Sequence, residues 1–203
     1  NPLVKAINQA GLCLLAIDLQ PLATYRALAG EDNCIIIDIG AWQSQISIFV
    51  NKIPRGYRTI PVGGEHFIKQ AQAVLPTEAA APELFWRRPV EPEKVAAVKS
   101  LIGDIWRELA NSLLQEINNT LRFFRTEIKP ARLATAYLVG GGSKIYGLVD
   151  FLRDKLDREM GREIRLAGDM QTGFLANDYL KIWGPRIATA VGLALYGGPY
   201  GSR

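Results

Sequence analysis

The sequence predicts an α/β domain in which helices flank a mixed β-sheet. Three observations predict it. Cys34–Gly40 is a run of β-branched residues that ends at a glycine, which is typical of a buried strand. Apolar residues recur every three or four positions through Glu91–Lys129, which predicts one long amphipathic helix that ends before Pro130. Thr135–Val139 predicts another strand, and it runs through three glycines into a helical pattern over Lys144–Met160.

The remaining elements follow from local pattern and from turn residues. The linker 41–44 is short enough to join its flanking strands as a hairpin. The proline-rich segment Pro76–Pro92 predicts a loop. The other expected elements are a strand at Leu12–Leu19, a helix from Pro21 to about Ala29, antiparallel strands at Gln45–Val50 and Tyr57–Val62, a helix at Glu65–Leu75, a strand at Glu163–Leu166 and a small-residue helix at Pro185–Tyr196.

Composition excludes several classes of protein. The chain has 203 residues, 48% of them hydrophobic and 22% charged, which is typical of a globular protein rather than a disordered one. No stretch is long and apolar enough to span a membrane, and a net charge of +4 does not by itself indicate an anionic partner. Two cysteines and one histidine cannot build a structural zinc site, and Cys13 and Cys34, each inside an apolar run, are expected to be buried thiols. The chain begins at Asn1 without a methionine, which suggests a piece of a longer protein.

The first candidate site is Asp38-Ile39-Gly40, at the end of a predicted strand, with Ser44 six residues after the aspartate. Glycine lets backbone N–H groups approach a ligand closely, and such groups can bind phosphate oxygens. A neighbouring carboxylate can hold a hydrated Mg²⁺ ion. The alternative is a hairpin whose aspartate only caps the turn.

The second candidate site is the turn Gly140-Gly141-Gly142-Ser143 between a strand and a helix. The N-terminus of a helix attracts anions through its free N–H groups and its dipole. The alternative is a tight turn with Ser143 as the helix N-cap. The residues match neither a P-loop nor a dinucleotide-binding fingerprint, because the required lysine and glycine spacings are missing.

Taken in sequence order, these motifs resemble the second half of the actin-like ATPase fold. Within that superfamily the chain resembles the PilM family of type IV pilus assembly proteins, which is related to FtsA. The stretches that carry the resemblance are Ile37–Gly40 as the second phosphate motif, Val62–Gly64 after the third strand, Leu113–Ile117 with Leu138–Leu148 as the adenosine-motif region, and Ala190–Leu195 as the closing connecting helix.

The resemblance implies an actin-like (ribonuclease H-like) ATPase domain II, with a mixed sheet, flanking helices and a small α+β subdomain. Residues 1–30 would be a crossover strand and helix from an absent N-terminal domain, and residues 176–203 a connecting helix and tail. Domain II would occupy residues 31–175, divided into a β-meander at 34–65, a helical subdomain at 66–129 and a strand, glycine turn and helix at 130–175.

The resemblance also implies ATP or ADP with Mg²⁺ as the ligand, and at most a slow ATPase that is inactive in this chain alone. Asp38 would position the magnesium and its water. The implied nucleotide-binding residues are Asp38, Gly40, Ser44, Gly63, Gly64, Gly140, Gly141, Gly142 and Ser143. The first phosphate motif of the family is absent, so the chain carries at most half a site. Trp42 stands at the hairpin tip where the family has small residues, so a degenerate site used as a scaffold is the alternative.

The implied partners are the cytoplasmic N-terminal peptide of the membrane protein PilN and other pilus platform proteins, with self-association possible. The implied location is the cytoplasmic side of the inner membrane, as a peripheral protein. The alternatives are an FtsA-like or secretion-system adaptor and a true Mg-ATP hydrolase. No nucleic acid is expected, since the cations Arg122, Arg125 and Lys129 suit the C-terminal end of a solvated helix. Phe85–Arg88 is a possible interface anchor.

Overall fold

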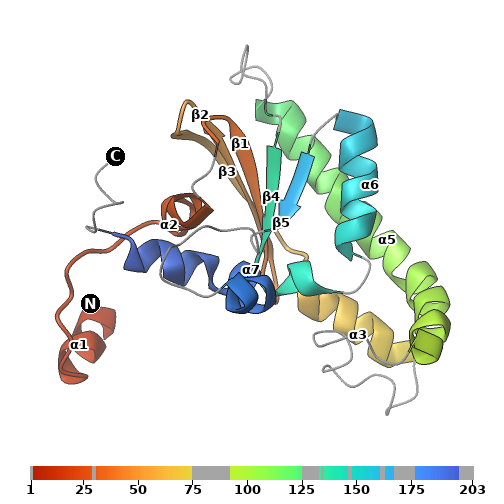
Figure 1. The fold of residues 1–203 in the computed structure, drawn as a ribbon, viewed down its shortest axis with the longest axis horizontal. Coiled ribbons are helices and arrows are strands. Elements are labelled where there is room, and N and C mark those ends of the chain that lie inside the picture. Colours follow the sequence, from red (N-terminus) through yellow and green to blue (C-terminus); the bar gives the residue numbers. More distant parts are fainter. Residues whose placement is uncertain are drawn as a thin grey trace.

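A five-stranded sheet with the order β3-β2-β1-β4-β5 forms the centre of the molecule (Figure 1). The strands are β1 (Cys34–Ile39), β2 (Ser44–Val50), β3 (Ile53–Ile60), β4 (Thr135–Val139) and β5 (Glu163–Leu166). The computed structural model describes residues 2–28, 31–74, 92–124, 133, 135–145, 148–160, 163–166 and 177–196.

The sheet is mixed, as predicted. β1, β2 and β3 form an antiparallel meander, whereas β4 runs parallel to β1 and β5 runs parallel to β4. A parallel neighbour needs a long crossover, and α3 and α5 lie in the sequence between β3 and β4. The register places Asp38 opposite Val139, so β1 and β4 end side by side.

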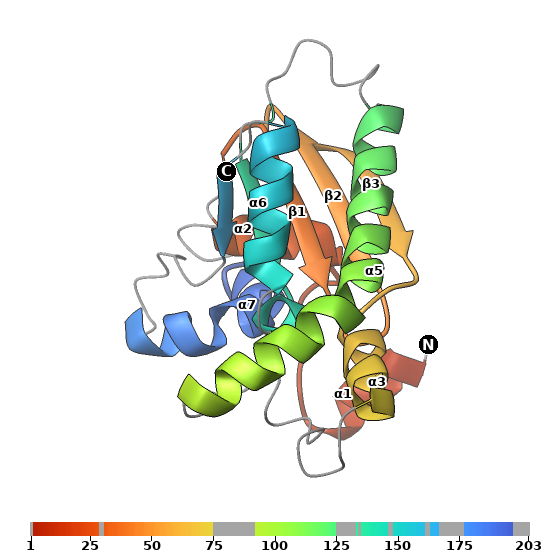
Figure 2. The ribbon, with the colours of Figure 1, turned by 90° about the vertical axis from the view of Figure 1, so that its right-hand side faces the viewer.

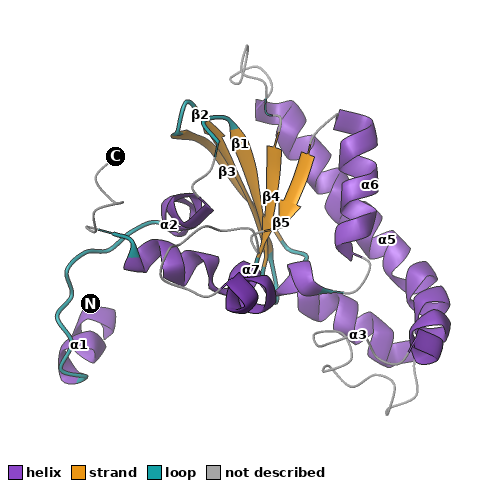
Figure 3. Cartoon of the chain, in the orientation of Figure 1, coloured by secondary structure: helices purple, strands orange, loops and turns teal. Residues whose placement is uncertain are grey.

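Helices cover both faces of the sheet (Figures 1 and 3). One face carries α5 and α6, which Figure 2 shows in front of the strands, and α2 and α7 lie on the opposite face. The helices are α1 (Pro2–Gln9), α2 (Gln20–Leu28), α3 (Gly64–Val74), α5 (Pro92–Phe124), α6 (Leu148–Met160) and α7 (Asn177–Ala194), with a 3-10 turn, η1 (Gly141–Lys144), after β4.

Alternation along β1 divides the apolar side chains between two cores. Ile35, Ile37 and Ile39 enter the larger core, against α3, α5 and α6. Cys34 and Ile36 enter the smaller core, against α2 and α7. The same alternation directs the Asp38 side chain toward the face that carries α2.

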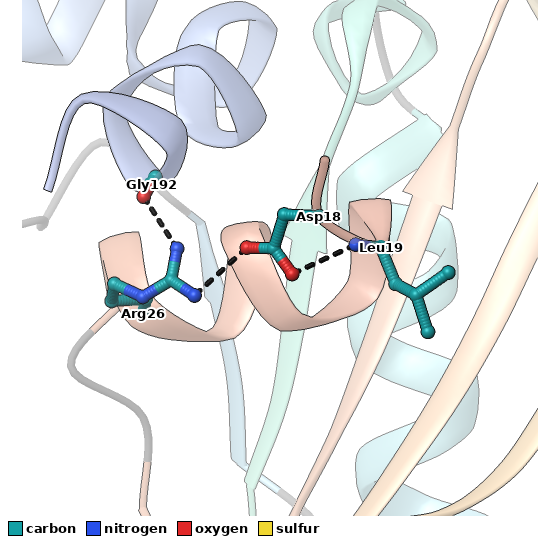
Figure 4. Close-up of polar contacts among 4 residues, drawn as sticks. All are labelled: Asp18, Leu19, Arg26 and Gly192. Carbon is teal, nitrogen blue, oxygen red and sulfur yellow. Dashed lines mark hydrogen bonds and ion pairs between the residues drawn. The ribbon is translucent and has the colours of Figure 1, made fainter. Parts of the chain in front are cut away.

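A polar contact joins α2 to α7, the two helices that pack on the smaller core (Figure 4). The Arg26 guanidinium donates to the Gly192 carbonyl at 2.6 Å and to the Asp18 carboxylate at 2.8 Å. Its charge also lies over the Tyr196 ring, 5.2 Å from the centroid. The helices approach so closely that a Cβ atom added to Gly192 would collide with the backbone of Ala23.

The predicted strand at Leu12–Leu19 is wrong. Residues 12–19 form a loop that pairs with no strand of the described sheet, and helix α1, which precedes them, is not predicted by the sequence pattern. The segment has an apolar pattern, but a β-strand also needs a neighbouring strand to pair with. None lies beside residues 12–19 in the described structure. Leu15 is therefore 90% exposed, and Cys13 is exposed too, contrary to the expectation of a buried thiol.

Other expected boundaries shift by several residues. The helix expected at Lys144–Met160 begins at Leu148, because the three glycines lead into η1 rather than directly into α6. α7 begins at Asn177 and holds Pro185 inside it, whereas the sequence predicts a start at Pro185. The predicted loop Pro76–Pro92 and the possible anchor Phe85–Arg88 lie outside the described residues, apart from Pro92, which begins α5. Within the described part of the chain, no helix is long and apolar enough to cross a membrane.

Candidate functional site

The two predicted glycine corners lie side by side at one edge of the sheet. β1 and β4 are adjacent and parallel, so their carboxyl ends meet there. A Cβ atom added to Gly140 would collide with the Asp38 carboxylate and the Ile39 carbonyl, and one added to Gly142 would collide with the Ile39 side chain. Gly140 also has a φ of +85°, which disfavours other residues. Glycine is therefore required at this corner for the chain to pass so close to Asp38.

Asp38 is the acidic group at this edge. Its Oδ2 atom accepts a hydrogen bond of 2.7 Å from the side-chain amide of Gln20, at the first position of α2. Burial raises the pKa of the Asp38 carboxyl above its ordinary value, and the hydrogen bond from Gln20 opposes that shift. The role of Gln20 is not predicted by the motifs of the sequence. The available signal was a lone polar amide directly before the proline of a predicted helix start.

Asp38 opens into a depression of about 440 Å³. The described residues that line it contribute one carboxylate, several side-chain amides and one indole, and none of them is a cation. They are Gln20, Asp38, Gly40, Ala41, Trp42, Gln43 and Gln45. This lining suits a ligand that brings positive charge to Asp38, either a metal ion or a cationic group.

The predicted glycine pair Gly63-Gly64, at the start of α3, lies against the tip of the β1–β2 hairpin. The Gly64 N–H donates to the Gly40 carbonyl at 2.8 Å, and the next amide of α3 donates to Ala41 at 2.7 Å. A Cβ atom on Gly63 would lie 2.5 Å from the Ala41 carbonyl and 2.6 Å from the Gln43 nitrogen. The glycine pair thus attaches the start of α3 to the loop that follows Asp38.

These contacts already use most of the backbone donors that the sequence assigns to phosphate. The donors and acceptors are Gly40 N–H to Gln43 at 3.0 Å, Gly63 N–H to His66 Nδ1 at 3.2 Å, Gly64 N–H to Gly40 at 2.8 Å, and Gly140 N–H to Pro185 at 2.7 Å. In this conformation those four amides hold the loops together. Gly141 and Gly142, at the start of η1, have the amides that helical geometry leaves without an intrahelical acceptor.

The two predicted serines support the loops from within. Ser44 is fully buried, and its hydroxyl donates to the Val62 carbonyl at 2.6 Å. Ser143 is 2% exposed and donates to the Gly140 carbonyl at 2.7 Å. Neither hydroxyl lines the depression, and Ser143 lies inside η1 rather than at the N-cap of α6. Their direct effect is to fix the shape of the two corners.

Trp42, at the hairpin tip, forms one wall of the depression and is 57% exposed. Two residues of α3 contact its ring. The Lys69 ammonium lies 4.6 Å from the ring centroid, and His66 meets it edge-on at 6.2 Å. A cation over an indole face is a stabilising contact, so α3 helps to orient this wall.

The residues present fit a hydrated magnesium ion better than a bare phosphate. Mg²⁺ keeps several waters and needs only one or two protein carboxylates, a requirement that Asp38 can meet alone. No group of three or more metal-ligating side chains occurs among the residues that the structure describes. A polyphosphate without a cation would meet only the negative charge of Asp38 in the described lining.

Comparison with known proteins identifies relatives that are about twice as long. No family model matches the sequence. The cell division protein FtsA of Neisseria meningitidis serogroup B is 26% identical over 219 aligned residues, which cover 93% of this chain and 49% of that protein. FtsA of Bacillus subtilis is 23% identical over 211 residues, covering 94% of this chain and 45% of the relative. The chain thus spans about half the length of these relatives.

Solved structures share the fold over nearly the whole chain. The PilM-PilN type IV pilus biogenesis complex matches with a TM-score of 0.69 and 27% identity, covering 96% of this chain and 56% of that one. The ethanolamine utilization protein EutJ of Carboxydothermus hydrogenoformans matches with a TM-score of 0.66 and 20% identity, over 96% and 60% of the two chains. MreB5 of Spiroplasma citri bound to AMPPNP matches at 0.59 and 12%, over 97% and 63%. These likenesses confirm the predicted actin-like fold.

Proposed function

We propose that this actin-like chain is one half of a nucleotide-binding scaffold that assembles at a membrane, with ATP or ADP and Mg²⁺ bound at the edge where β1 and β4 end. The observation that carries the proposal is the meeting of the two glycine corners beside Asp38. The similarity to MreB5 bound to AMPPNP supports a nucleotide as the ligand of the fold. Asp38 would hold the hydrated metal, and the η1 amides of Gly141 and Gly142 would face the nucleotide.

Magnesium, when bound, would neutralise phosphate charge. The residues of this chain would do the rest. Gln20 would orient the Asp38 carboxylate, and the hydroxyls of Ser44 and Ser143 would keep the two corners in shape. The second wall of the site would come from the half of the fold that this chain does not span, since nucleotides in actin-like proteins lie between two domains.

The partner that we propose is the cytoplasmic N-terminal peptide of PilN. The similarity to the PilM-PilN complex, at 27% identity over 96% of this chain, supports it. The protein would then lie peripherally on the cytoplasmic side of the inner membrane, within the type IV pilus platform. An FtsA-like adaptor is the rival, supported by 26% and 23% identity to the two FtsA proteins.

Isothermal titration calorimetry of the full-length protein with Mg-ATP and Mg-ADP tests the nucleotide site. We expect wild type to bind and Asp38→Asn to lose at least about tenfold in affinity, equivalent to about 1.4 kcal/mol. Asp150→Asn is the matched control, because it removes the same charge from a side chain that is 82% exposed on α6. Equal nucleotide affinities for wild type and Asp38→Asn would show that Asp38 takes no part in binding.

Stability measurements separate loss of the ligand from loss of the fold. Burial raises the Asp38 pKa, so ionising this group costs the folded state free energy at neutral pH. Asp38→Asn removes that cost and should stabilise the ligand-free protein at pH 7. The gain should shrink as the pH falls through the raised pKa of the folded state, and it should be absent below 3.8, the ordinary pKa of aspartate, where both states bind the proton. A variant that is more stable yet binds less nucleotide marks a functional carboxylate.

The partner is tested separately. The cytoplasmic N-terminal peptide of the PilN from the same organism, labelled with fluorescein, is titrated with the full-length protein in the presence of Mg-ATP. Saturable binding that a scrambled peptide does not reproduce supports the pilus platform. Absence of binding by a protein that still binds nucleotide would favour the FtsA-like adaptor.

A further inference from the structure

We propose that the free edge of β3 is a docking site for an extended, acidic segment of a partner protein, which would add a strand to the sheet. This surface is separate from the nucleotide site and does not depend on the proposed function. It is defined by the residues of β3 and by Lys52, which precedes the strand. Its partner is identified by chemistry alone: an acidic peptide with alternating apolar side chains.

The backbone of β3 is available on one side. β3 is the terminal strand of the sheet and pairs only with β2 in the described structure (Figure 2). In an antiparallel strand, every second residue directs its N–H and C=O groups away from the neighbour, so an edge strand presents a row of unpaired donors and acceptors. Ile53 through Thr59 are all exposed or partly exposed, and only Ile60 is buried.

The accessible part of the edge has a defined register. The pairing is regular from Gly56, opposite Ile48, to Ile60, opposite Ser44. The register then shifts between Ile48 and Phe49, and Pro54 carries no backbone N–H. The shift and the proline end the ladder at one side, so an added segment would align along residues 56–59, with one end beside Arg55.

The charge of the edge favours an acidic partner over a second copy of this chain. Residues 51–60 contain Lys52, Arg55 and Arg58 and no acidic residue. Lys52 lies 3.5 Å from Asp32, but both side chains are about two thirds exposed, so this pair neutralises little. Arg58 pairs with Glu116 at 2.8 Å. No ion pair is found for Arg55 within the described chain. Two such edges would repel each other.

Apolar side chains flank the edge on both faces of the sheet. Ile53 and Tyr57 are each 50% exposed. Ile53 is opposite Val50 and Tyr57 is opposite Ser47, which places the two side chains on opposite faces because the faces alternate along β2. On one face of the sheet, side chains of an added strand would lie beside Tyr57. Its acidic side chains would lie near the basic residues of the β3 edge. Backbone bonds would supply affinity, and these side chains would supply selectivity.

Fluorescence anisotropy with a labelled octapeptide of alternating valine and glutamate tests the proposal on the full chain. We expect saturable binding, at least about tenfold weaker binding of the valine–lysine peptide, and a similar loss for the acidic peptide with N-methylated backbone amides. Arg55→Glu should weaken binding at least about tenfold. Arg153→Glu, on α6, makes the same charge change away from the edge and should leave binding within about twofold.

Hydrogen exchange gives the second measurement, and we expect the acidic peptide to slow exchange of the β3 amides. Equal weakening by Arg55→Glu and Arg153→Glu would mean attraction by overall charge, and it would overturn the docking site. Undiminished binding of the N-methylated peptide would overturn strand addition. Failure of the acidic peptide to bind would overturn the proposal. The basic residues and Pro54 would then serve only to prevent aggregation through the edge of the sheet. Because Asp38→Asn should leave this binding unchanged, the outcome is distinct from that of the nucleotide test.

Discussion

Replacing Arg26 by methionine should destabilise the contact between α2 and α7. The guanidinium serves two acceptors at once, donating to Asp18 at 2.8 Å and to the Gly192 carbonyl at 2.6 Å. Methionine keeps much of the unbranched stem that packs near the Tyr196 ring, and it removes the charge and both donors. The variant therefore isolates the polar contact from the packing.

The expected loss follows from burial. The Arg26 and Asp18 side chains are 19% and 10% exposed, so the variant removes the cationic donor from a mostly buried carboxylate and the side-chain donor from the Gly192 carbonyl. Removing one partner of a buried pair costs about 3 to 5 kcal/mol, and the partial exposure here favours the lower end, about 3 kcal/mol. The Leu19 N–H still donates to Asp18 at 2.8 Å, which supports the lower figure. For a chain of this length, the Tm should fall by about 10 °C.

Urea denaturation followed by circular dichroism measures this loss. Lys52→Met is the matched control, because the Lys52–Asp32 pair is about two thirds exposed and should be worth under about 1 kcal/mol. The double variant Asp18→Asn/Arg26→Met should lose less than Arg26→Met alone, since no uncompensated charge remains. If Arg26→Met and Lys52→Met lose equal stability, the reasoning from burial is refuted.

Two further results are expected. Cys13 is exposed and should react with Ellman's reagent in the native protein. Cys34 is buried, and burial together with the Glu31 charge raises its pKa to about 12, so its thiol should react only after unfolding. Fast reaction of both thiols in the native protein would contradict this. Gly192→Ala should lower the free energy of unfolding, measured by urea denaturation, by at least about 2 kcal/mol, because the new Cβ would collide with the Ala23 backbone. Ala190→Ser, at an exposed position of α7, is the control. Equal losses for the two variants would show that α2 and α7 can move apart without cost.

The central sheet could be predicted because its pattern is local. The β-branched run Cys34–Ile39 alternates between two cores, and the linker after it is too short for anything but a hairpin. The helical stripe that was expected over 91–129 appears as α5, from Pro92 to Phe124. In the strand and in the part of α5 from Leu109 to Phe124, the apolar residues that define the element also pack into the core, so local pattern and tertiary environment agree.

The segment before α2 could not be predicted in the same way. Leu12–Leu19 has the composition of a buried strand, yet strand formation depends on a neighbour that local sequence does not specify. Leu15, Ile17 and Leu19 are exposed in this chain for that reason, and so is Cys13. With Leu12, these are five exposed apolar side chains in one segment, and the relatives that the chain matches are about twice as long.

The candidate site shows the same division between what is local and what is not. Sequence identified Asp38 and the glycine corners, because strand ends and glycine turns are local features. It could not show that the amides of Gly40 and Gly64 are already used within the protein, since their acceptors come from the folded arrangement of hairpin and helix. It also missed Gln20, which reaches Asp38 across 18 positions of sequence.

The arrangement of donors and charge favours a ligand that brings its own cation. The described lining of the depression holds one carboxylate and no cation, and four of the predicted phosphate-binding amides are occupied. A polyphosphate therefore gains little from this half of the site unless a cation accompanies it. Asp38, whose ionisation burial already disfavours, gains most from such a cation, because a nearby positive charge offsets that cost. Under the proposed function, the nucleotide would therefore bind as its magnesium complex, with Asp38 holding the hydrated metal and the amides of Gly141 and Gly142 facing the rest of the ligand.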